Sequence, residues 1–431
     1  MTTLPIVAEI GAQTRRKIAW HILPFVFLLY IIAYLDRANV AFAKLSMSAD
    51  LGFSEAVFGF GAGIFFLGYF LLEIPGALIV ERWSARRWMA RILVSWGVFT
   101  ILVGLVRSHT HFYVARFLLG AAEAGFFPGI IVYLTHWFPA QDRARAMGGF
   151  IMAAPLSLTL GAPLSGLILN LRWWGLPGWR WVFILEGIPA VVFGLITLGY
   201  LTDHPRQARW LETEEKNWIE ARLLAEKKEI RKARPLTFGQ TLRQRKVLLL
   251  CLAHFFANIG GYGFIVWLPT IVNKVGKLSA ATANAASALP FALAVLSVWL
   301  AGYSSDRSGE RRLHACIAFL AAGLFFFLAT RPGLPFSQAM FWLSLTGAAV
   351  YAWCPPFWVL PTLIAEGPAA AGAIGMINSI GNLGGFVGPS VVGYLLTTNH
   401  SYSVAVGVLS VCYCIAAALT FSIPYGQTRT D

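Results

Sequence analysis

Charged residues are scarce in this chain. They make up 13% of its 431 residues, against 57% hydrophobic residues, and the mean hydropathy is +0.65. Because soluble domains carry about a quarter charged residues, this composition excludes a soluble globule. The five cysteines lie in apolar stretches without metal-ligand spacing, which favours small packing residues over a metal site or a disulfide framework. The N-terminus lacks a short apolar core with a cleavage site, so we expect no cleaved signal peptide.

Sequence motifs of enzyme chemistry are also missing. The chain has no His-x-x-x-His, Cys-x-x-Cys or Gly-x-Ser-x-Gly pattern, so neither a metal centre nor a nucleophile with its base is indicated. We therefore expect no enzyme activity and no cofactor. A membrane-embedded enzyme or a non-transporting membrane sensor remains an alternative from another class. A sensor needs an output domain, and the charged segment in the middle of the chain is too short for one.

Apolar segments of membrane-spanning length are abundant. A bilayer core of about 30 Å needs roughly 20 apolar residues per helix. Twelve such segments lie at 18–43, 57–80, 90–106, 112–137, 146–171, 181–201, 247–272, 280–303, 313–329, 336–364, 369–396 and 402–423. We predict an all-α polytopic membrane protein whose twelve transmembrane helices form two six-helix bundles, at 1–202 and 247–431, joined by a charged linker at 203–246.

The lysines and arginines are distributed unevenly over the two sides of this predicted bundle. Of the 34, 25 fall on the side of the N-terminus and the linker and 7 on the other side, among them Lys44. The positive-inside rule then places both termini in the cytoplasm, and we expect a monomer in a bacterial-type inner membrane. The net charge of +14 is thus a topology signal, and no nucleic-acid partner is expected. The linker predicts a short amphipathic helix at the membrane surface. Its apolar positions are Leu211, Trp218, Ala221 and Ala225.

A short charged motif occurs twice, at the same place in each predicted half. Glu81-Arg82-Trp83-Ser84-Ala85-Arg86-Arg87 follows the second span, and Asp306-Arg307-Ser308-Gly309-Glu310-Arg311-Arg312 follows the eighth. The repetition indicates duplicated halves, the parallel repeat of a rocking transporter. We expect Glu81 and Asp306 to clamp these loops as a conformational latch, and the arginines of both loops to belong to the same gate. The residues concerned are Glu81, Arg82, Arg86, Asp306, Arg307 and Arg311.

The second copy of this motif resembles the loop signature of the major facilitator superfamily, with Gly302 four residues before Asp306. The wider match is to the anion:cation symporter family of that superfamily. It rests on the stretches 34–39, 116–129, 179–189 and 377–386, and 65–75 looks most like bacterial tartrate and phthalate permeases. One departure is Gly76-Ala77, where many relatives have Ser-Asn. The resemblance implies a substrate-carboxylate ligand at Arg37, a proton carrier at Glu123 and a cavity donor at Tyr69.

Charges inside the predicted spans are confined to the first half. Such residues are costly in a membrane and usually functional. They are Asp36, Arg37, Glu73, Arg116, Glu123 and Glu186. Depth along the helices places Asp36 level with Arg116, so we expect these two to pair. That would leave Arg37 free for an anion and Glu123, near mid-membrane, free for a proton; a purely structural network is the alternative.

Glu73 and Glu186 point less clearly to function. For Glu73, a role in transport and a structural pair with a basic loop residue both stay open. We expect Glu186 to be structural, near the start of its helix.

The second half offers neutral polar side chains instead. Asn258 and Tyr262 continue a stripe that begins with His254, for which a neutral, satisfied ring is expected. Asn378 and Asn382 form another stripe, and Trp353 precedes a Pro355-Pro356 break that could present an aromatic wall. The pattern fits substrate contacts as well as interhelical hydrogen bonds, and both interpretations stay open.

Together these features predict proton-coupled symport of a small organic carboxylate by alternating access. Anion exchange and sodium coupling are alternatives, and the carboxylate could be tartrate-, phthalate-, hydroxyaromatic- or sugar-acid-like. If Asp36 occupies Arg116, one carboxylate is matched well and a second poorly. Hydroxylated monoanions should then bind at least as well as dianions.

Overall fold

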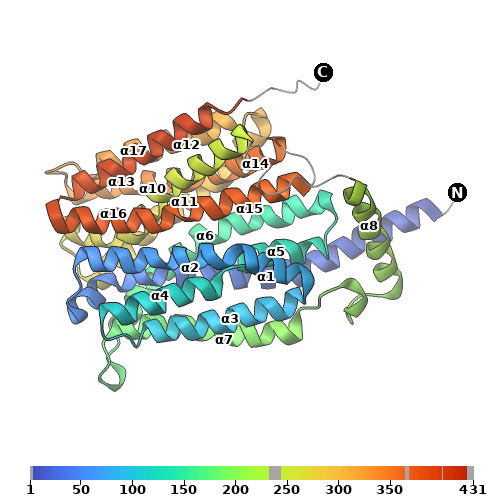
Figure 1. Ribbon diagram of the computed structural model, residues 1–431, viewed down its shortest axis with the longest axis horizontal. Coiled ribbons are helices and arrows are strands. Elements are labelled where there is room, and N and C mark those ends of the chain that lie inside the picture. The colour runs from blue at the N-terminus through green and yellow to red at the C-terminus, as the bar shows by residue number, and fades with distance from the viewer. Residues whose placement is uncertain (1–2, 233–243, 365–367, 400, 425–431) are drawn as a thin grey trace.

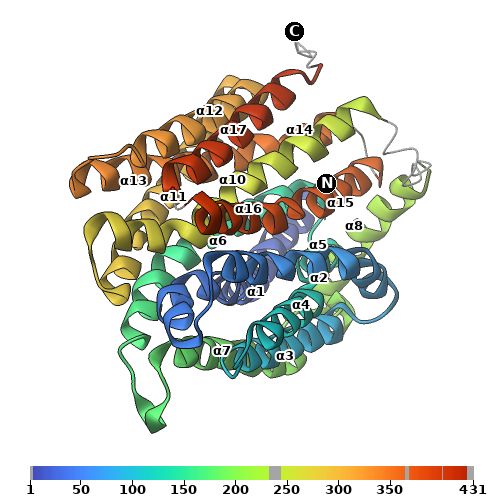
Figure 2. The same cartoon turned by 60° about the vertical axis from the view of Figure 1, so that its left-hand side comes forward.

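The structure, a computed structural model, describes residues 3–232, 244–364, 368–399 and 401–424. In these ranges every regular element is a helix. The helices lie side by side, with the first half (blue to green) and the second half (yellow to red) as two adjacent groups (Figures 1 and 2). We call the end of the bundle with the N-terminus and α8 (Thr213–Lys232) the termini end, and the opposite one the far end.

The first half contains seven helices. They are α1 (Thr3–Leu51), α2 (Glu55–Arg82), α3 (Ala85–Val103), α4 (His109–Glu123), α5 (Phe126–Thr135), α6 (Ala140–Ile168) and α7 (Gly178–Tyr200). Serine residues begin three of them, because the side chains of Ser54, Ser84 and Ser108 accept from backbone N–H groups of the first turn. Short 3-10 turns lie at Trp173–Gly175 and Pro205–Gln207.

The second half contains eight helices in its described part. They are α10 (Arg245–Gly276), α11 (Ala280–Ser308), α12 (Arg312–Ala329), α13 (Phe336–Ala352), α14 (Cys354–Ile364), α15 (Pro368–Asn382), α16 (Gly384–Asn399) and α17 (Tyr402–Phe421). Fifteen helices thus fill the twelve predicted spans, because three spans are broken. The breaks fall at Gly125, which takes a left-handed φ of 85°, at Trp353 before the two prolines, and at Leu383.

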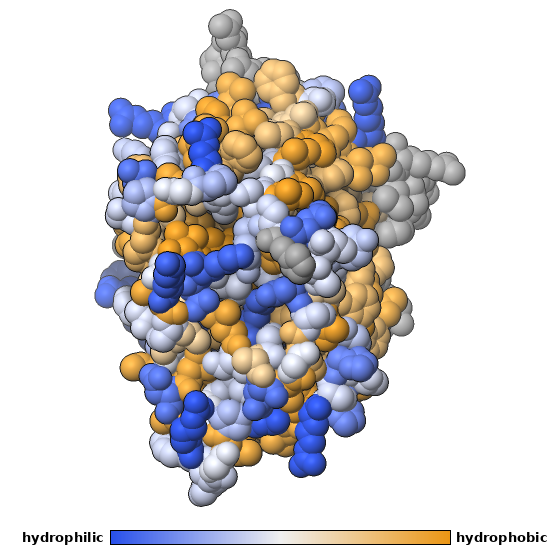
Figure 3. All heavy atoms as spheres, turned by 90° about the vertical axis from the view of Figure 1, so that its left-hand side faces the viewer, coloured by the Kyte–Doolittle hydropathy of each residue, from blue (hydrophilic) through white to orange (hydrophobic). Residues whose placement is uncertain are grey.

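The bundle has the surface of a membrane protein. Within the described ranges, nine helical segments are long and apolar enough to cross a membrane, and α3, α6 and the α15–α16 pair supply the other three predicted spans. Large apolar side chains such as Leu167, Trp299 and Ile317 are more than half exposed. The far end, seen face-on in Figure 3, mixes hydrophilic with hydrophobic side chains, as expected where helices leave a bilayer.

The linker helix α8 packs against α1. Trp218 lies over Gly11, where an added Cβ would meet the indole at 2.6 Å, and Lys17 pairs with Glu215 at 2.9 Å. Ile219 and Leu223 are buried, whereas the predicted apolar positions Ala221 and Ala225 are exposed. The packing face is therefore rotated from the predicted stripe. Leu211 and Trp218 of the predicted stripe do face the bundle, whereas the two alanines are small enough for a polar surface to accommodate them.

Candidate functional site: an ion pair at the centre of the bundle

The centre of the bundle holds an ion pair between Arg37 of α1 and Glu123 of α4. The side chains are 14% and 2% exposed. Helix α4 ends directly after this carboxylate, at the left-handed Gly125. Sequence reasoning selected both residues but left each without a protein partner, and that part of the prediction is wrong.

Aromatic rings surround the guanidinium of Arg37. Its central carbon lies 5.1 Å from the ring centroid of Tyr34, 5.3 Å from Tyr69 and 5.6 Å from Phe65. From the second half, the hydroxyl of Tyr262 accepts a hydrogen bond from Arg37 Nη1 at 3.4 Å. Two predicted residues, Tyr69 and Tyr262, thus lie at the ion pair. Tyr34 was not predicted as a site residue, although its position one helical turn before Arg37 is a signal for it.

The expected pairing of Asp36 with Arg116 is wrong. Asp36 accepts hydrogen bonds from the indole Nε1 of Trp96 at 2.6 Å and from Asn39 at 3.5 Å. Arg116 donates through Nη2 to the backbone carbonyl of Ala62 at 3.1 Å. Neighbouring residues on a helix point about 100° apart, so Arg37 faces α4 while Asp36 faces α3. Depth alone could not reveal this direction.

Arg37 and Arg116 line the same small central cavity. It has a volume of about 20 Å³, and its walls also include Tyr34, Tyr262 and Ile265. A space of this size holds about one water molecule. An organic anion therefore requires the two halves to move apart at this point.

His254 organises the neutral side of the second half. Its Nδ1 lies 3.0 Å from the carbonyl oxygen of Ile377, which can only accept, so Nδ1 carries the proton. Nε2 then accepts from the amide Nδ2 of Asn258 at 3.2 Å. Trp353 packs edge-on against this imidazole at 5.6 Å between ring centroids and is buried. Among the predicted site residues, Asn258 and Trp353 thus belong to the His254 environment.

Glu73 connects the two halves. Its buried carboxylate accepts a hydrogen bond from the Asn378 amide at Oε1 and one from the Ser379 hydroxyl at Oε2, 2.8 Å away. The alternative of a basic loop partner for Glu73 is therefore wrong. Asn378 lies at this contact, and Asn382 lies one turn further along α15, also buried. Matching an acid on α2 with an amide on α15 requires knowledge of which helices face each other, which the sequence lacks.

The far end holds three further contacts between the halves. The ammonium group of Lys44 lies 4.4 Å from the ring centroid of Trp267 and pairs with Glu55 at 2.8 Å. Asn284 donates to the carbonyl oxygen of Phe42 at 2.9 Å, and the Thr397 hydroxyl accepts from the N–H of Ala56 at 2.9 Å. Lys44 is 2% exposed, so counting it as an outside loop residue was wrong. The prediction ended the first helix at residue 43, whereas α1 continues to Leu51.

The first repeated loop joins helices within the first half. Arg86 donates to the carbonyl oxygens of Leu198 and Leu201 at the end of α7, and its N–H donates to Asp203 at 2.9 Å. The side chains of Glu81 and Arg82 lie outside the described residues, so their predicted role is not tested. Glu186 accepts from the Ser165 hydroxyl at 2.6 Å, in agreement with a structural role.

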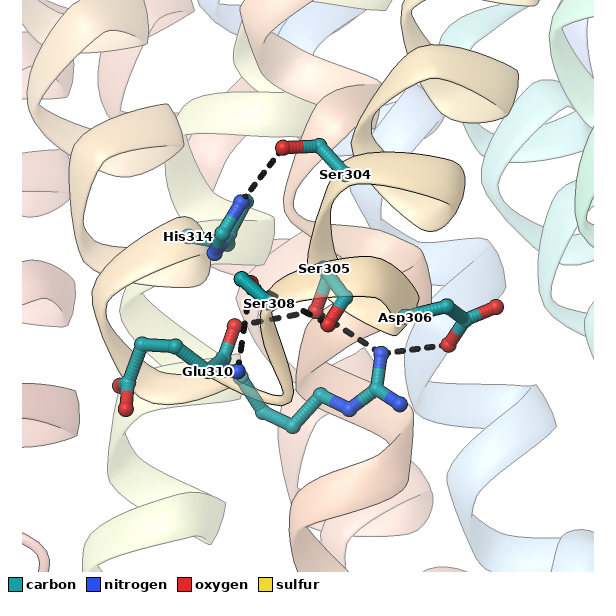
Figure 4. A network of polar contacts seen from close by, with 7 residues as sticks. Ser304, Ser305, Asp306, Ser308, Glu310 and His314 are labelled. Carbon is teal, nitrogen blue, oxygen red and sulfur yellow. Dashed lines mark hydrogen bonds and ion pairs between the residues drawn. The ribbon is translucent and has the colours of Figure 1, made fainter.

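The second repeated loop folds back on itself. Arg311 donates to the Ser305 hydroxyl at 3.0 Å and to the Asp306 carboxylate at 2.5 Å. Figure 4 shows Ser305 and Asp306 at the end of α11. Arg307 is exposed and reaches the Tyr303 hydroxyl at 3.5 Å. Arg312, which follows Arg311, donates to the carbonyl oxygens of Phe421 and Ile423 at the end of α17. Each of these hydrogen bonds of Arg86, Arg311 and Arg312 joins residues of the same half.

Comparison with known proteins decides the family. A family model described as Major Facilitator Superfamily matches residues 26–389. The chain belongs to this superfamily. A protein of Agrobacterium vitis that carries the provisional name tartrate transporter is 44% identical over 96% of this chain and 92% of its own length. A quinolone resistance transporter of Acinetobacter baumannii is 36% identical over 95% of this chain and 94% of its own length.

The fold comparison agrees with the sequence comparison. The xylose transporter XylE of Escherichia coli, in a partially occluded inward open conformation, superposes with a TM-score of 0.75 at 14% identity, covering 95% of this chain and 98% of its own. The family predicted from the motifs is thus confirmed at the level of the superfamily and of tartrate-transporter relatives. The chain is a multi-pass membrane transporter and not an enzyme.

Proposed function

We propose that this superfamily member couples the movement of a small organic carboxylate to the movement of a proton by alternating access. The Arg37–Glu123 ion pair carries the proposal, because it joins a cation and an acid at the cavity between the two halves. The tartrate name of the 44% identical relative supports an organic acid as substrate. We place the protein in a bacterial-type inner membrane with the termini end in the cytoplasm, and we expect it to act as a monomer.

Coupling follows from competition for one guanidinium. An ionised Glu123 neutralises Arg37 and occupies its donors, so a substrate carboxylate has to displace it. Protonation of Glu123 removes its charge and releases Arg37, which then binds the carboxylate. Proton and anion therefore load together. After the anion leaves on the other side, Glu123 gives up its proton and restores the pair.

Alternating access needs contacts that close each end in turn. The far end is closed by the contacts of Lys44, Asn284 and Thr397, and the termini end by Glu73 with Asn378. Each contact links one half to the other, so opening an end breaks only the contacts of that end. The central cavity lies between the two sets.

The proposal is tested with purified protein in proteoliposomes, using L-tartrate as the probe and an imposed pH gradient. We expect Arg37→Ala to abolish tartrate binding. Glu123→Gln mimics the protonated acid, so it should bind and exchange tartrate but no longer accumulate it. Glu186→Gln, at a buried acid away from the cavity, is the matched control and should accumulate tartrate normally. Full proton-driven accumulation by Glu123→Gln would refute the coupling scheme and favour exchange or sodium coupling.

A further inference from the structure

Arg116 is a buried cation with unused hydrogen-bond donors. The residue is 1% exposed, and its Nη2 donates a hydrogen bond to the Ala62 carbonyl. In the described part of the chain, Nε and Nη1 have no hydrogen-bond partner. Leaving donors of a buried charge unsatisfied costs free energy, more than for neutral groups. Burying this guanidinium with unsatisfied donors therefore costs free energy, which an acceptor from outside the described side chains would recover.

The position of Arg116 indicates where that acceptor binds. Both guanidinium groups lie against the ring of Phe65, with central carbons 4.8 Å from its centroid for Arg116 and 5.6 Å for Arg37. Both residues also line the central cavity, together with Tyr34 and Tyr262. An anion held by Arg37 would therefore lie next to the side chain of Arg116.

The charges around the cavity are matched by a dianion. Asp36 is turned toward Trp96, and Glu73 is held by the second half, which leaves Glu123 as the acid bonded to the site. Once Glu123 is protonated, neither of the two arginines that line the cavity is bonded to a carboxylate of the described residues. A monoanion would neutralise one of them and leave the other buried without a carboxylate partner, whereas a dianion would match both.

We infer that Arg116 is a second carboxylate anchor, and that the site takes a short dicarboxylate bound between Arg37 and Arg116. This inference rests on the proposed function, and it names the substrate class of that site. Hydroxyl groups between the two carboxylates can hydrogen bond to the hydroxyls of Tyr34 and Tyr262, which line the same space. It reverses the expectation that hydroxylated monoanions bind at least as well as dianions, because that expectation required Asp36 to occupy Arg116.

The test compares two ligands that differ in one charge: tartrate and its monoamide, in which one carboxylate is replaced by a neutral group of similar shape. Calorimetry on the detergent-solubilised protein gives both affinities. We expect the wild type to bind tartrate about 10- to 100-fold tighter than the monoamide, the ratio for one charge-assisted contact. Arg116→Gln, which keeps a donor for the Ala62 carbonyl, should lose this preference and bind both ligands alike. Arg116→Lys should keep part of it.

Other outcomes separate this inference from the proposed function. Equal affinity of the wild type for both ligands would overturn the inference even if no Arg116 variant folds. An equal loss of affinity for both ligands in Arg116→Gln would assign Arg116 a structural role and also overturn it. In either case a strong dependence on Arg37 would leave the proposed function intact. Binding that is unaffected by Arg37→Ala would refute the proposed function itself.

Discussion

Closure of the far end depends on glycines where α2 meets α16. A Cβ added at Gly59 would lie 2.3 Å from the carbonyl oxygen of Pro389, and one at Gly393 would lie 2.4 Å from that of Glu55. Ordinary carbon–oxygen contacts are about 3.3 Å, so Gly59→Ala requires the two backbones to part by about 1 Å. A backbone atom cannot rotate away as a side chain can. The closed far end should therefore be destabilised, whereas a far end that has opened is not.

The size of the effect can be stated in advance. Overpacking of this kind costs about 1–3 kcal/mol. Because the cost falls on one conformation, the ratio of open to closed far ends should rise by about 5- to 150-fold. Spin labels at Arg107→Cys and Arg331→Cys, two exposed positions in loops of different halves, would report this by pulsed electron resonance in a cysteine-free background. We expect the longer-distance population to grow in Gly59→Ala.

A second glycine substitution serves as the control. Gly407 lies in α17, where an added Cβ meets nothing within 4 Å, so Gly407→Ala should leave the distance distribution unchanged. An unchanged distribution in Gly59→Ala as well would show that the α2–α16 contact does not set closure. The reasoning about the far end would then be wrong.

Three further substitutions probe other contacts. Glu73→Gln turns an amide N–H₂ toward donors of α15, so labels on the exposed Arg87→Cys and Arg307→Cys should move apart at the termini end; an unchanged distance would argue against this closure contact. His254→Leu strands the Asn258 amide and the Ile377 carbonyl and should cost about 1–3 kcal/mol, seen as a lower melting temperature in detergent that the same change at exposed His109 does not produce. Asp203→Ala removes the acceptor for the N–H of Arg86 at the start of α3 and should cost about 1 kcal/mol in the same melt; an unchanged melting temperature would refute the capping role.

Much of the fold could be predicted because the length of an apolar segment is a local property of the sequence. The twelve spans, their two halves and the break before Pro355-Pro356 could all be read from short windows of sequence. The break at Gly125 could not, because a glycine alone does not reveal whether the chain adopts a left-handed φ there. The end of α1 was missed since Lys44 looks like a loop residue until Trp267 is known to lie above its ammonium group.

Several residues of the candidate site could be predicted from the sequence, but the partner of each residue could not. Arg37 and Glu123 were selected because charge is unusual in a membrane span. Tyr262 was selected because it continues a polar stripe, and Tyr69 through the family resemblance. Which acid meets which arginine depends on the rotation of each helix about its axis and on which helices are neighbours. Depth gives neither, so Asp36 was assigned to Arg116.

Arg86 and Arg312 make equivalent contacts, because each donates to backbone carbonyls at the end of the last helix of its own half. They do not occupy equivalent positions in the repeated motif. When the two motifs are aligned, Arg86 corresponds to Arg311, yet the arginine that holds the end of the last helix of the second half is Arg312. A doublet of arginines tolerates a shift of one residue, because either neighbour can reach the helix-end carbonyls when the loop is remodelled. Swapping loops between halves by alignment alone would therefore transplant the wrong arginine, and a functional chimera has to be designed one residue out of register.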